Sequence, residues 1–225
     1  MSSASWSEIF VLQEARRVTL DPVSRDDDLV RRAQAGDASA FRALFVEHRA
    51  EVARLVQRMV GPRADLEDLV QEVFLQVHRS LDGFRGQSKF TTWLHRVTVN
   101  VVLMQRRSAR SRPVLVEDTA TEGRPDGGAW PDEEAARRER VRAFYRLLDR
   151  LADKKRTVYV LHEIDGRSPA DIAKIVGAPV LTVRTRLFYA RRELAEMLRD
   201  EPTLAALGHE LEAEASERRS SGGTP

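Results

Sequence analysis

The segment between Thr182 and Arg192 carries side chains that suit contact with DNA. Four arginines occur there without an acidic residue among them, and Thr182, Thr185 and Tyr189 add hydroxyl groups. A guanidinium pairs with a phosphate or with the edge of guanine, and a hydroxyl bonds either backbone or base. This segment is therefore a candidate DNA-binding surface, and its arginines are Arg184, Arg186, Arg191 and Arg192.

The residues before this segment predict the element that would present it. Ser168 is a good N-cap, Pro169 suits the first helical position, and Gly177 can end a short helix with positive φ. A second helix is expected to follow Pro179. The pattern of a short helix, a glycine turn and a second helix predicts a helix-turn-helix, whose second helix enters the major groove. The inward-facing residues would be Ile172, Val176, Val183 and Leu187.

A second group of reactive side chains lies near position 70. Asp65, Glu67, Asp68 and Glu72 are clustered in sequence, and carboxylates of this kind can hold a catalytic metal ion or bind a basic partner. No cysteine is present, and the five histidines are scattered without a His-x-x-x-His pair. The sequence therefore predicts no metal, no cofactor and no thiol chemistry.

Charge is distributed unevenly along the chain of 225 residues, although its net charge is only +2. Residues 89–112 hold six basic residues and no acid, whereas residues 117–134 hold seven acids and one arginine. A basic stretch suits a phosphate backbone. Solvated helix faces would give the same composition, so charge alone leaves both interpretations open.

Apolar residues at three- and four-residue spacing predict an all-α fold of two helical domains joined by a flexible acidic linker. The first domain spans 26–112 and the second spans 135–200, with the linker at 113–134. Asp26 to Asp28 are expected to form the acidic first turn of the first helix. The expected helices of the first domain then cover about 41–59, 65–81 and 90–110, and those of the second cover 133–150, 155–163, 169–176 and 180–198.

The two ends carry little regular pattern. Residues 1–25 predict a weakly ordered extension with a short apolar stretch at 9–12, and 201–225 predict a tail. No apolar run approaches the roughly 20 residues that span a bilayer, and the start lacks the pattern of a signal peptide. We expect a cytoplasmic protein without direct membrane insertion.

Three stretches of the first domain resemble one family. The sequences DLEDLVQEVFLQV (65–77), FRG (84–86) and FTTWLHRV (90–97) look like region 2 of extracytoplasmic-function (ECF) sigma factors, group 4 of the sigma-70 family. Residues 151–194 resemble region 4 of the same family. Both occur in order and with the expected gap, and the resemblance covers about residues 26–200.

The resemblance implies a bacterial alternative sigma factor that directs promoter-specific transcription initiation without catalysis of its own. It assigns the docking surface for the β′ clamp helices of core RNA polymerase to Asp65, Glu67, Asp68, Gln71 and Glu72. It assigns melting and capture of the −10 element to Phe84, Lys89, His95, Arg96, Val97, Thr98, Asn100, Arg106 and Arg107, with Arg110 as a further phosphate contact. Trp93 is expected in the core.

Region 4 of the family reads the −35 element, and the polymerase β flap is a further implied partner. The corresponding residues here are Thr182, Arg184, Thr185, Arg186, Phe188, Tyr189 and Arg191. Leu181 stands where the family commonly has Gly, Tyr189 where it has Arg, and His95 where it has Tyr. Because Tyr cannot make the bidentate guanine contact of Arg, we expect a −35 sequence different from the family's AAC-centred one. The acidic linker resembles a segment that threads near the polymerase active site. The family also implies an anti-sigma factor, which could hold the protein at the membrane, and a free monomer.

Three other interpretations stay open at this stage. A helix-turn-helix repressor or activator would act as a dimer on a palindromic operator. A nuclease would need the acids near position 70 to surround a metal ion. An adaptor would bind polymerase but not DNA. The acidic helix and the FTTWL segment have no role in the repressor, and the basic segments have none in the adaptor.

Overall fold

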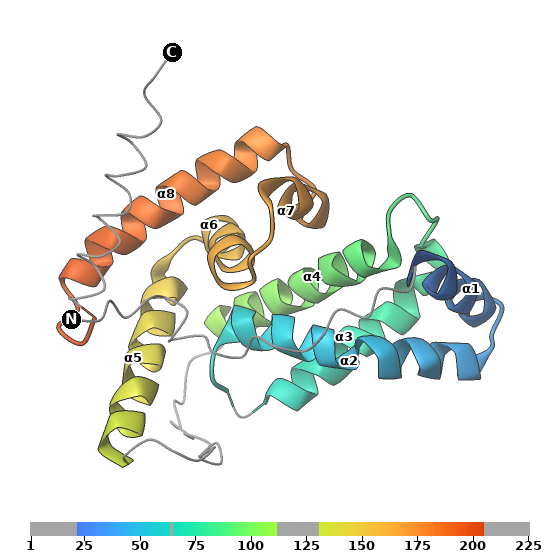
Figure 1. Ribbon diagram of the computed structural model, residues 1–225, viewed down its shortest axis with the longest axis horizontal. Coiled ribbons are helices and arrows are strands. Elements are labelled where there is room, and N and C mark those ends of the chain that lie inside the picture. Colours follow the sequence, from blue (N-terminus) through green and yellow to red (C-terminus); the bar gives the residue numbers. More distant parts are fainter. Residues whose placement is uncertain (1–21, 64, 112–130, 205–225) are drawn as a thin grey trace.

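The computed structural model describes residues 22–63, 65–111 and 131–204, and every regular element within these ranges is helical (Figure 1). The all-α prediction is confirmed. The predicted extension before residue 22, the linker residues 113–130 and the tail beyond residue 204 lie outside the described ranges. None of the described helices is both long and apolar enough to cross a membrane.

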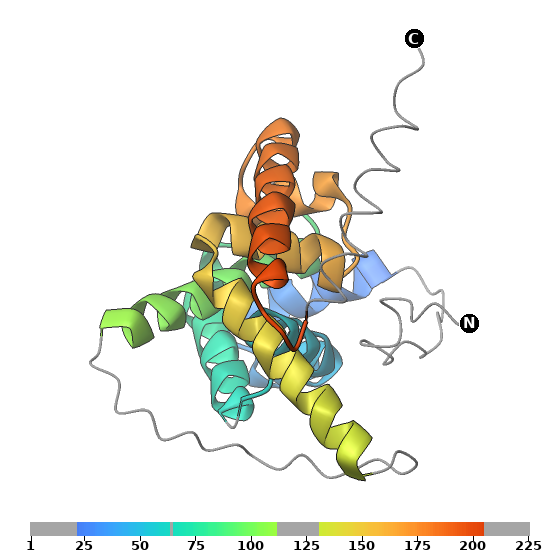
Figure 2. The ribbon, with the colours of Figure 1, turned by 90° about the vertical axis from the view of Figure 1, so that its left-hand side faces the viewer.

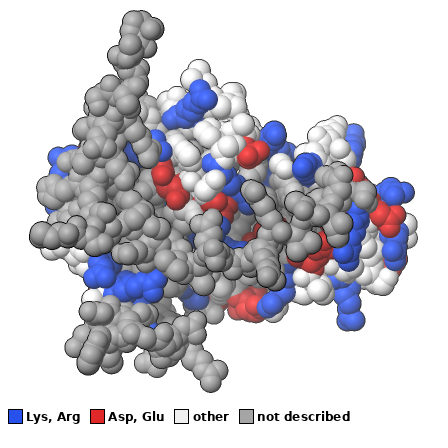
Figure 3. All heavy atoms as spheres, in the orientation of Figure 1, with Lys and Arg blue, Asp and Glu red and all other residues white. Residues whose placement is uncertain are grey.

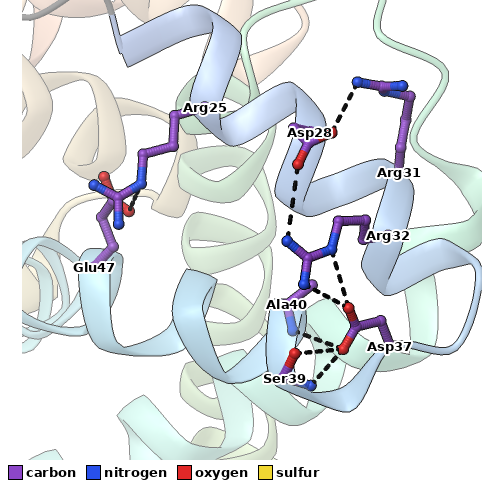
Figure 4. Close-up of polar contacts among 8 residues, drawn as sticks. All are labelled: Arg25, Asp28, Arg31, Arg32, Asp37, Ser39, Ala40 and Glu47. Atoms are coloured by element: carbon purple, nitrogen blue, oxygen red, sulfur yellow. Dashed lines mark hydrogen bonds and ion pairs between the residues drawn. The ribbon is translucent and has the colours of Figure 1, made fainter.

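Helix α1 (Pro22–Gln34) begins four residues earlier than predicted, so its first turn contains no acid. The prediction that Asp26 to Asp28 form this turn was wrong, because Asp26 is instead buried against His48. Asp37 then caps α2 (Ala38–Val60) by accepting from the amides of Ser39 at 2.8 Å and Ala40 at 3.2 Å, as Figure 4 shows. These bonds satisfy amides that the first helical turn leaves unpaired.

Helices α2, α3 (Leu66–Ser80) and α4 (Phe90–Ser111) pack through the apolar stripes that the sequence predicts. Val56, Val73 and Leu94 are fully buried at their centre. A 3₁₀ turn, η2 (Leu81–Gly83), leads from α3 into the loop before α4. Trp93 packs against this core, as predicted, beside the rings of Phe84 and Phe90. Helices α1–α4 thus form a first domain with one continuous core.

The second domain contains α5 (Pro131–Arg150), α6 (Asp153–Tyr159), α7 (Pro169–Val176) and α8 (Val180–Arg199). Helix α5 begins two residues before the predicted 133, and the predicted helix at 155–163 is α6 followed by a π-helical turn, η3 (Val160–Ile164). The helix-turn-helix signals are confirmed: Ser168 caps α7 through its hydroxyl, and Gly177 ends it in the left-handed conformation.

The two domains pack directly against each other. Figures 1 and 2 show α4 between the other first-domain helices and the second domain, and α4 contacts α7. Tyr145 of α5 donates its hydroxyl to the carbonyl of Arg58 at 3.0 Å. The ring of Tyr145 lies over Gly61, where a Cβ would come within 2.6 Å of it. Gly61 also has φ +79°, so this position needs glycine for two reasons.

We expect Gly61→Ala to lower the free energy of unfolding more than Gly36→Ala does. Both glycines have positive φ, but nothing lies within 4 Å of a Cβ at Gly36, whereas one at Gly61 meets Tyr145. The backbone penalty is about 1 kcal/mol, and the overlap with the ring adds about 1–3 kcal/mol. Urea unfolding of both variants measures the difference. An equal fall in the free energy of unfolding would show that the Tyr145 ring moves aside at little cost.

Candidate nucleic-acid interface

Helix α8 presents one face to the second-domain core and the other to solvent. Val183, Leu187 and Ala190 are buried, while Arg184, Thr185 and Phe188 are exposed. No acidic residue lies in its first turn, and its N-cap, Pro179, provides no side-chain cap. The outward face therefore combines cations, an unneutralised helix N-terminus and apolar groups, which suits entry into the major groove of DNA.

Not every predicted residue on α8 is free. Arg191 donates from Nε to Glu163 at 2.7 Å, and the Tyr189 ring lies between two cations, Lys155 at 5.8 Å and Arg192 at 5.7 Å. Thr182 and Arg186 are only partly exposed. The structure thus leaves Arg184, Thr185 and Phe188 as the most accessible members of the predicted −35 set, and the DNA contacts of the whole set stay predictions.

Helix α3 carries the predicted polymerase-docking acids on its exposed side. Arg49 binds Glu67 at 2.7 Å, Arg63 binds Asp65 at 2.7 Å, and Arg79 approaches Glu72 at 3.8 Å. Asp68 is exposed and forms no ion pair with any residue that the structure describes. Surface pairs of this kind contribute about 0–1 kcal/mol, so a basic partner can displace them. Gln71 is exposed beside them.

The predicted −10 residues separate into buried and exposed sets. Thr98 is fully buried and its hydroxyl bonds the carbonyl of Leu94 at 2.9 Å. Phe84 packs edge-on against Phe90, and Val97 is 8% exposed. These three side chains complete the first-domain core, and their contacts with DNA stay predictions. The exposed members are Lys89, Arg96, Asn100 and Arg107.

The second domain occupies several cationic groups of α4. Arg106 pairs with Asp149 and lies 3.5 Å from Asp153, and Arg110 lies 3.2 Å from the same Asp153 carboxylate. Arg96 donates to the carbonyl of Lys174 in α7 at 2.5 Å. The second domain therefore engages arginines that the prediction assigns to DNA phosphates. Where the face drawn in Figure 3 is not grey, basic and acidic side chains are interspersed.

A network of histidines and carboxylates lies where α1, α2 and α4 meet the second domain. His48 binds Asp26 at 3.0 Å, and His95 binds Glu51 at 2.7 Å. Arg167 of the second domain lies 3.2 Å from the same Nε2 of His95. This cluster was missed by sequence reasoning, because histidines 47 residues apart show no shared pattern. Within the described ranges no group of side chains has the arrangement of a metal site.

Asp165, next to this network, and Glu51, within it, complete the contact between the domains. Asp165, which follows η3, binds both Arg58 of α2 and Arg167. The hydrogen bonds of Glu51 with His48 and His95 lower the pKa of its carboxyl, so it stays ionised between the histidines. The domain contact is therefore ionic as well as apolar.

Arg156 of α6 is almost fully buried, at 1% exposure, next to this contact. Its Nε lies 3.3 Å from Asp149, yet its guanidinium nitrogens make no hydrogen bond to any described group. Burial, and then the nearby Arg106, lower its pKa to about 10. A buried guanidinium without full hydrogen bonding is costly, so Arg156 destabilises the contact between the two domains. We call this arrangement of the two domains in contact the closed arrangement.

Comparison with known proteins defines the class of this helical pair. The family model described as Sigma-70 region 2 matches residues 44–112, which hold most of α2 and all of α3 and α4. The model described as Sigma-70, region 4 matches residues 141–194, from within α5 to within α8. The two matches fall on the two domains, in the order that the sequence predicts.

The chain is 38% identical over 176 residues to the ECF RNA polymerase sigma-E factor of Escherichia coli K12, covering 75% of this chain and 92% of that protein. The Haemophilus influenzae sigma-E factor is 37% identical, covering 74% and 91%. The chain belongs to the ECF sigma factors of the sigma-70 family and is an alternative sigma factor.

Two solved structures share this architecture. CnrH in complex with the cytosolic domain of CnrY superposes with a TM-score of 0.55 at 26% identity, covering 79% of this chain and 99% of CnrH. The sigma factor RpoE of Bartonella quintana, in complex with the anti-sigma factor NepR, gives 0.50 at 22% identity, covering 72% and 98%. The second likeness concerns the fold alone.

We expect stability to fall as pH rises from about 6.5 to 9. Burial disfavours charge on His48, but its bonds with Asp26 and Glu51 outweigh this and raise its pKa to about 9. The folded protein then holds a proton that the unfolded chain releases near pH 6.5, so the stabilisation is full below pH 6.5 and lost above 9. This stabilisation amounts to about 3 kcal/mol. Urea unfolding across pH 6–10 measures it, and His48→Gln should flatten the profile; an unchanged slope in that variant would contradict this origin.

Proposed function

We propose that this alternative sigma factor binds core RNA polymerase through the acidic face of α3, opens the −10 element with α4 and reads the −35 element with α8. The observation that carries the proposal is the pairing of an exposed acidic helix in one domain with a solvent-facing cationic reader helix in the other. In this role the chain is a non-catalytic subunit.

The acidic face of α3 suits a basic helical surface such as the polymerase β′ clamp helices. Asp68 is available at once, whereas Asp65 and Glu67 would exchange Arg63 and Arg49 for partner cations. Leu75 is 51% exposed on the same helix and adds an apolar contact. Affinity at protein interfaces depends on such apolar groups more than on rim charges.

Contact with the −10 element requires the two domains to separate. Arg96 and Arg106 are held by second-domain oxygens, whereas Phe84 and Thr98 are covered within the core of the first domain itself. Asn100 and Lys89 are exposed without this step. We infer that opening frees the arginines for phosphates, and that capture of an extruded base follows with local movement in the loop before α4.

An anti-sigma factor is a further proposed partner. CnrH and the Bartonella quintana RpoE were each solved with a protein bound, CnrY and the anti-sigma factor NepR. A protein that stabilised the closed domain pair of this chain would keep the α4 arginines from DNA. The dimeric repressor is not favoured, because it gives the acidic face of α3 no role.

The test of the proposal is transcription by core RNA polymerase with and without the protein on a library of promoter fragments. Specific transcripts that depend on the protein, and that are lost in Asn100→Ala, are the expected result. DNA binding that is independent of polymerase would contradict the proposal and favour the repressor.

Charge reversal at Asp68 is expected to weaken binding to core RNA polymerase about tenfold or more, because like charges would then face each other across the interface. Asp27→Arg in α1 is the matched control, since Asp27 is an exposed acid outside the proposed docking face. Fluorescence anisotropy of labelled protein titrated with core enzyme measures both. Equal affinities for the two variants would place the docking surface elsewhere.

Asp153→Asn is expected to raise the affinity of the free protein for promoter DNA about threefold, since it weakens the hold on Arg106 and Arg110. Asp149 is left intact because it also faces the buried Arg156. Glu139→Gln, which removes one acid of an exposed pair with Arg146, controls for net charge. An equal rise in DNA affinity in both variants would show that the change in net charge, and not the release of the arginines, causes the effect.

A further inference from the structure

We propose that Leu181, the methyl group of Thr185 and Phe188 form an apolar strip that recognises thymine methyl groups in the −35 element. The inference rests on the proposed function of α8 as the −35 reader. It adds a specificity rule to that function: the element must present thymine, on either strand, where the strip enters the major groove.

The apolar strip is unusually exposed. Of the seven large hydrophobic side chains exposed in the described residues, four lie on α8, and Leu181 is the most exposed of all at 74%. Phe188 is 50% exposed. Single exposed apolar residues need no explanation, but a group on the one face that would enter the groove indicates a contact surface.

Helical geometry places the strip on a single face. Leu181, Thr185 and Phe188 follow one another by four and three residues, which are neighbouring positions on a helix surface. Val183 and Leu187 occupy the opposite, buried face, so the strip cannot turn toward the core. Side chains tilt toward the N-terminus of their helix, and Leu181 in the first turn therefore projects toward the bottom of a groove that α8 enters by this end.

Thr185 joins the apolar strip because its hydroxyl is already used. Its Oγ1 donates to the carbonyl of Leu181 at 3.0 Å, within the helix. The hydroxyl hydrogen is thus unavailable as a donor to a base, and although the oxygen can still accept, the methyl group is the apolar part of the side chain that can extend the strip. Arg184 lies beside the strip as the accessible cation of this face.

The chemical complement of such a strip is the C5-methyl group of thymine, the apolar group that a base pair displays in the major groove. Leu181 and Phe188 are separated by seven residues, or about 10 Å along the helix axis, so the two side chains can reach different base pairs. The strip can therefore contact thymines at up to two nearby positions, while Arg184 pairs with guanine or phosphate.

The test uses holoenzyme reconstituted from core RNA polymerase and the full chain, on a promoter that it transcribes. Each thymine of the −35 element is replaced in turn by deoxyuridine, which removes only the methyl group. At one or two positions we expect promoter affinity to fall about fourfold, the effect of one methyl-sized burial. Leu181→Ala or Phe188→Ala should give a similar fall on thymine DNA and little further fall on the sensitive deoxyuridine DNA.

Thr185 provides a matched pair of variants. Thr185→Val keeps a methyl group and loses the hydroxyl, whereas Thr185→Ser keeps the hydroxyl and loses the methyl. We expect Val to retain methyl-dependent binding and Ser to lose it. Val46→Ala, an exposed apolar residue of α2 outside any proposed interface, should change nothing.

The outcomes distinguish failure of the thymine-methyl inference from failure of the proposed function of the protein. If no promoter yields transcripts dependent on the wild-type chain, the proposed function fails and the strip fails with it. If transcription is specific but deoxyuridine is tolerated at every −35 position, the methyl inference is overturned alone. A loss of activity in Leu181→Ala that is equal on thymine and deoxyuridine DNA would instead assign the strip to a protein partner.

Discussion

A guanidinium group that is paired with a carboxylate has part of its charge neutralised and fewer N–H donors left for a DNA phosphate. Arg106 and Arg110 of α4 are paired in this way with Asp149 and Asp153, and Arg96 donates to the carbonyl of Lys174. In the proposed function, the position of the second domain therefore affects what the first domain can bind. Helix α4 is central to this proposal, since it is both a core helix of its own domain and the surface that α7 contacts.

The contact between the two domains contains both favourable and costly interactions. Asp165, Arg58, Arg167, Glu51 and His95 form an ionic chain across the contact, and Tyr145 over Gly61 adds an apolar and hydrogen-bonded anchor. Against these stands Arg156, buried without its full set of hydrogen bonds.

Most of the local structure could be predicted from the sequence, because it depends on neighbours in the chain. The cap at Ser168, the left-handed Gly177 and the apolar stripes of α3 and α4 were all confirmed. The packing of the two domains could not be predicted from the sequence, because it joins residues far apart in the chain, such as Arg58 and Asp165. The same reason hid the pairing of Asp26 with His48. The start of α1 at Pro22 was also missed, although proline suits the first position of a helix.

In the predicted site, too, local features could be predicted from the sequence and long-range contacts could not. The exposed acids of α3 and the outward residues of α8 follow from helical periodicity, which sequence reveals directly. The burial of Thr98 and the pairing of Arg106 depend on tertiary contacts, so family resemblance could assign them a role but not their environment. The family resemblance assigns roles in a complex with polymerase and DNA. The structure describes the chain alone, in which arginines such as Arg106 pair with acidic residues of the same chain.

The most direct test of domain opening is the distance between the domains, measured by spin or fluorescent labels. The chain has no native cysteine, so Ala50→Cys in α2 and Ala152→Cys before α6 would provide two unique, exposed attachment points. The account predicts one short distance in the free protein and a longer one in the transcribing complex with core polymerase and promoter. The same short distance in an active complex would contradict it.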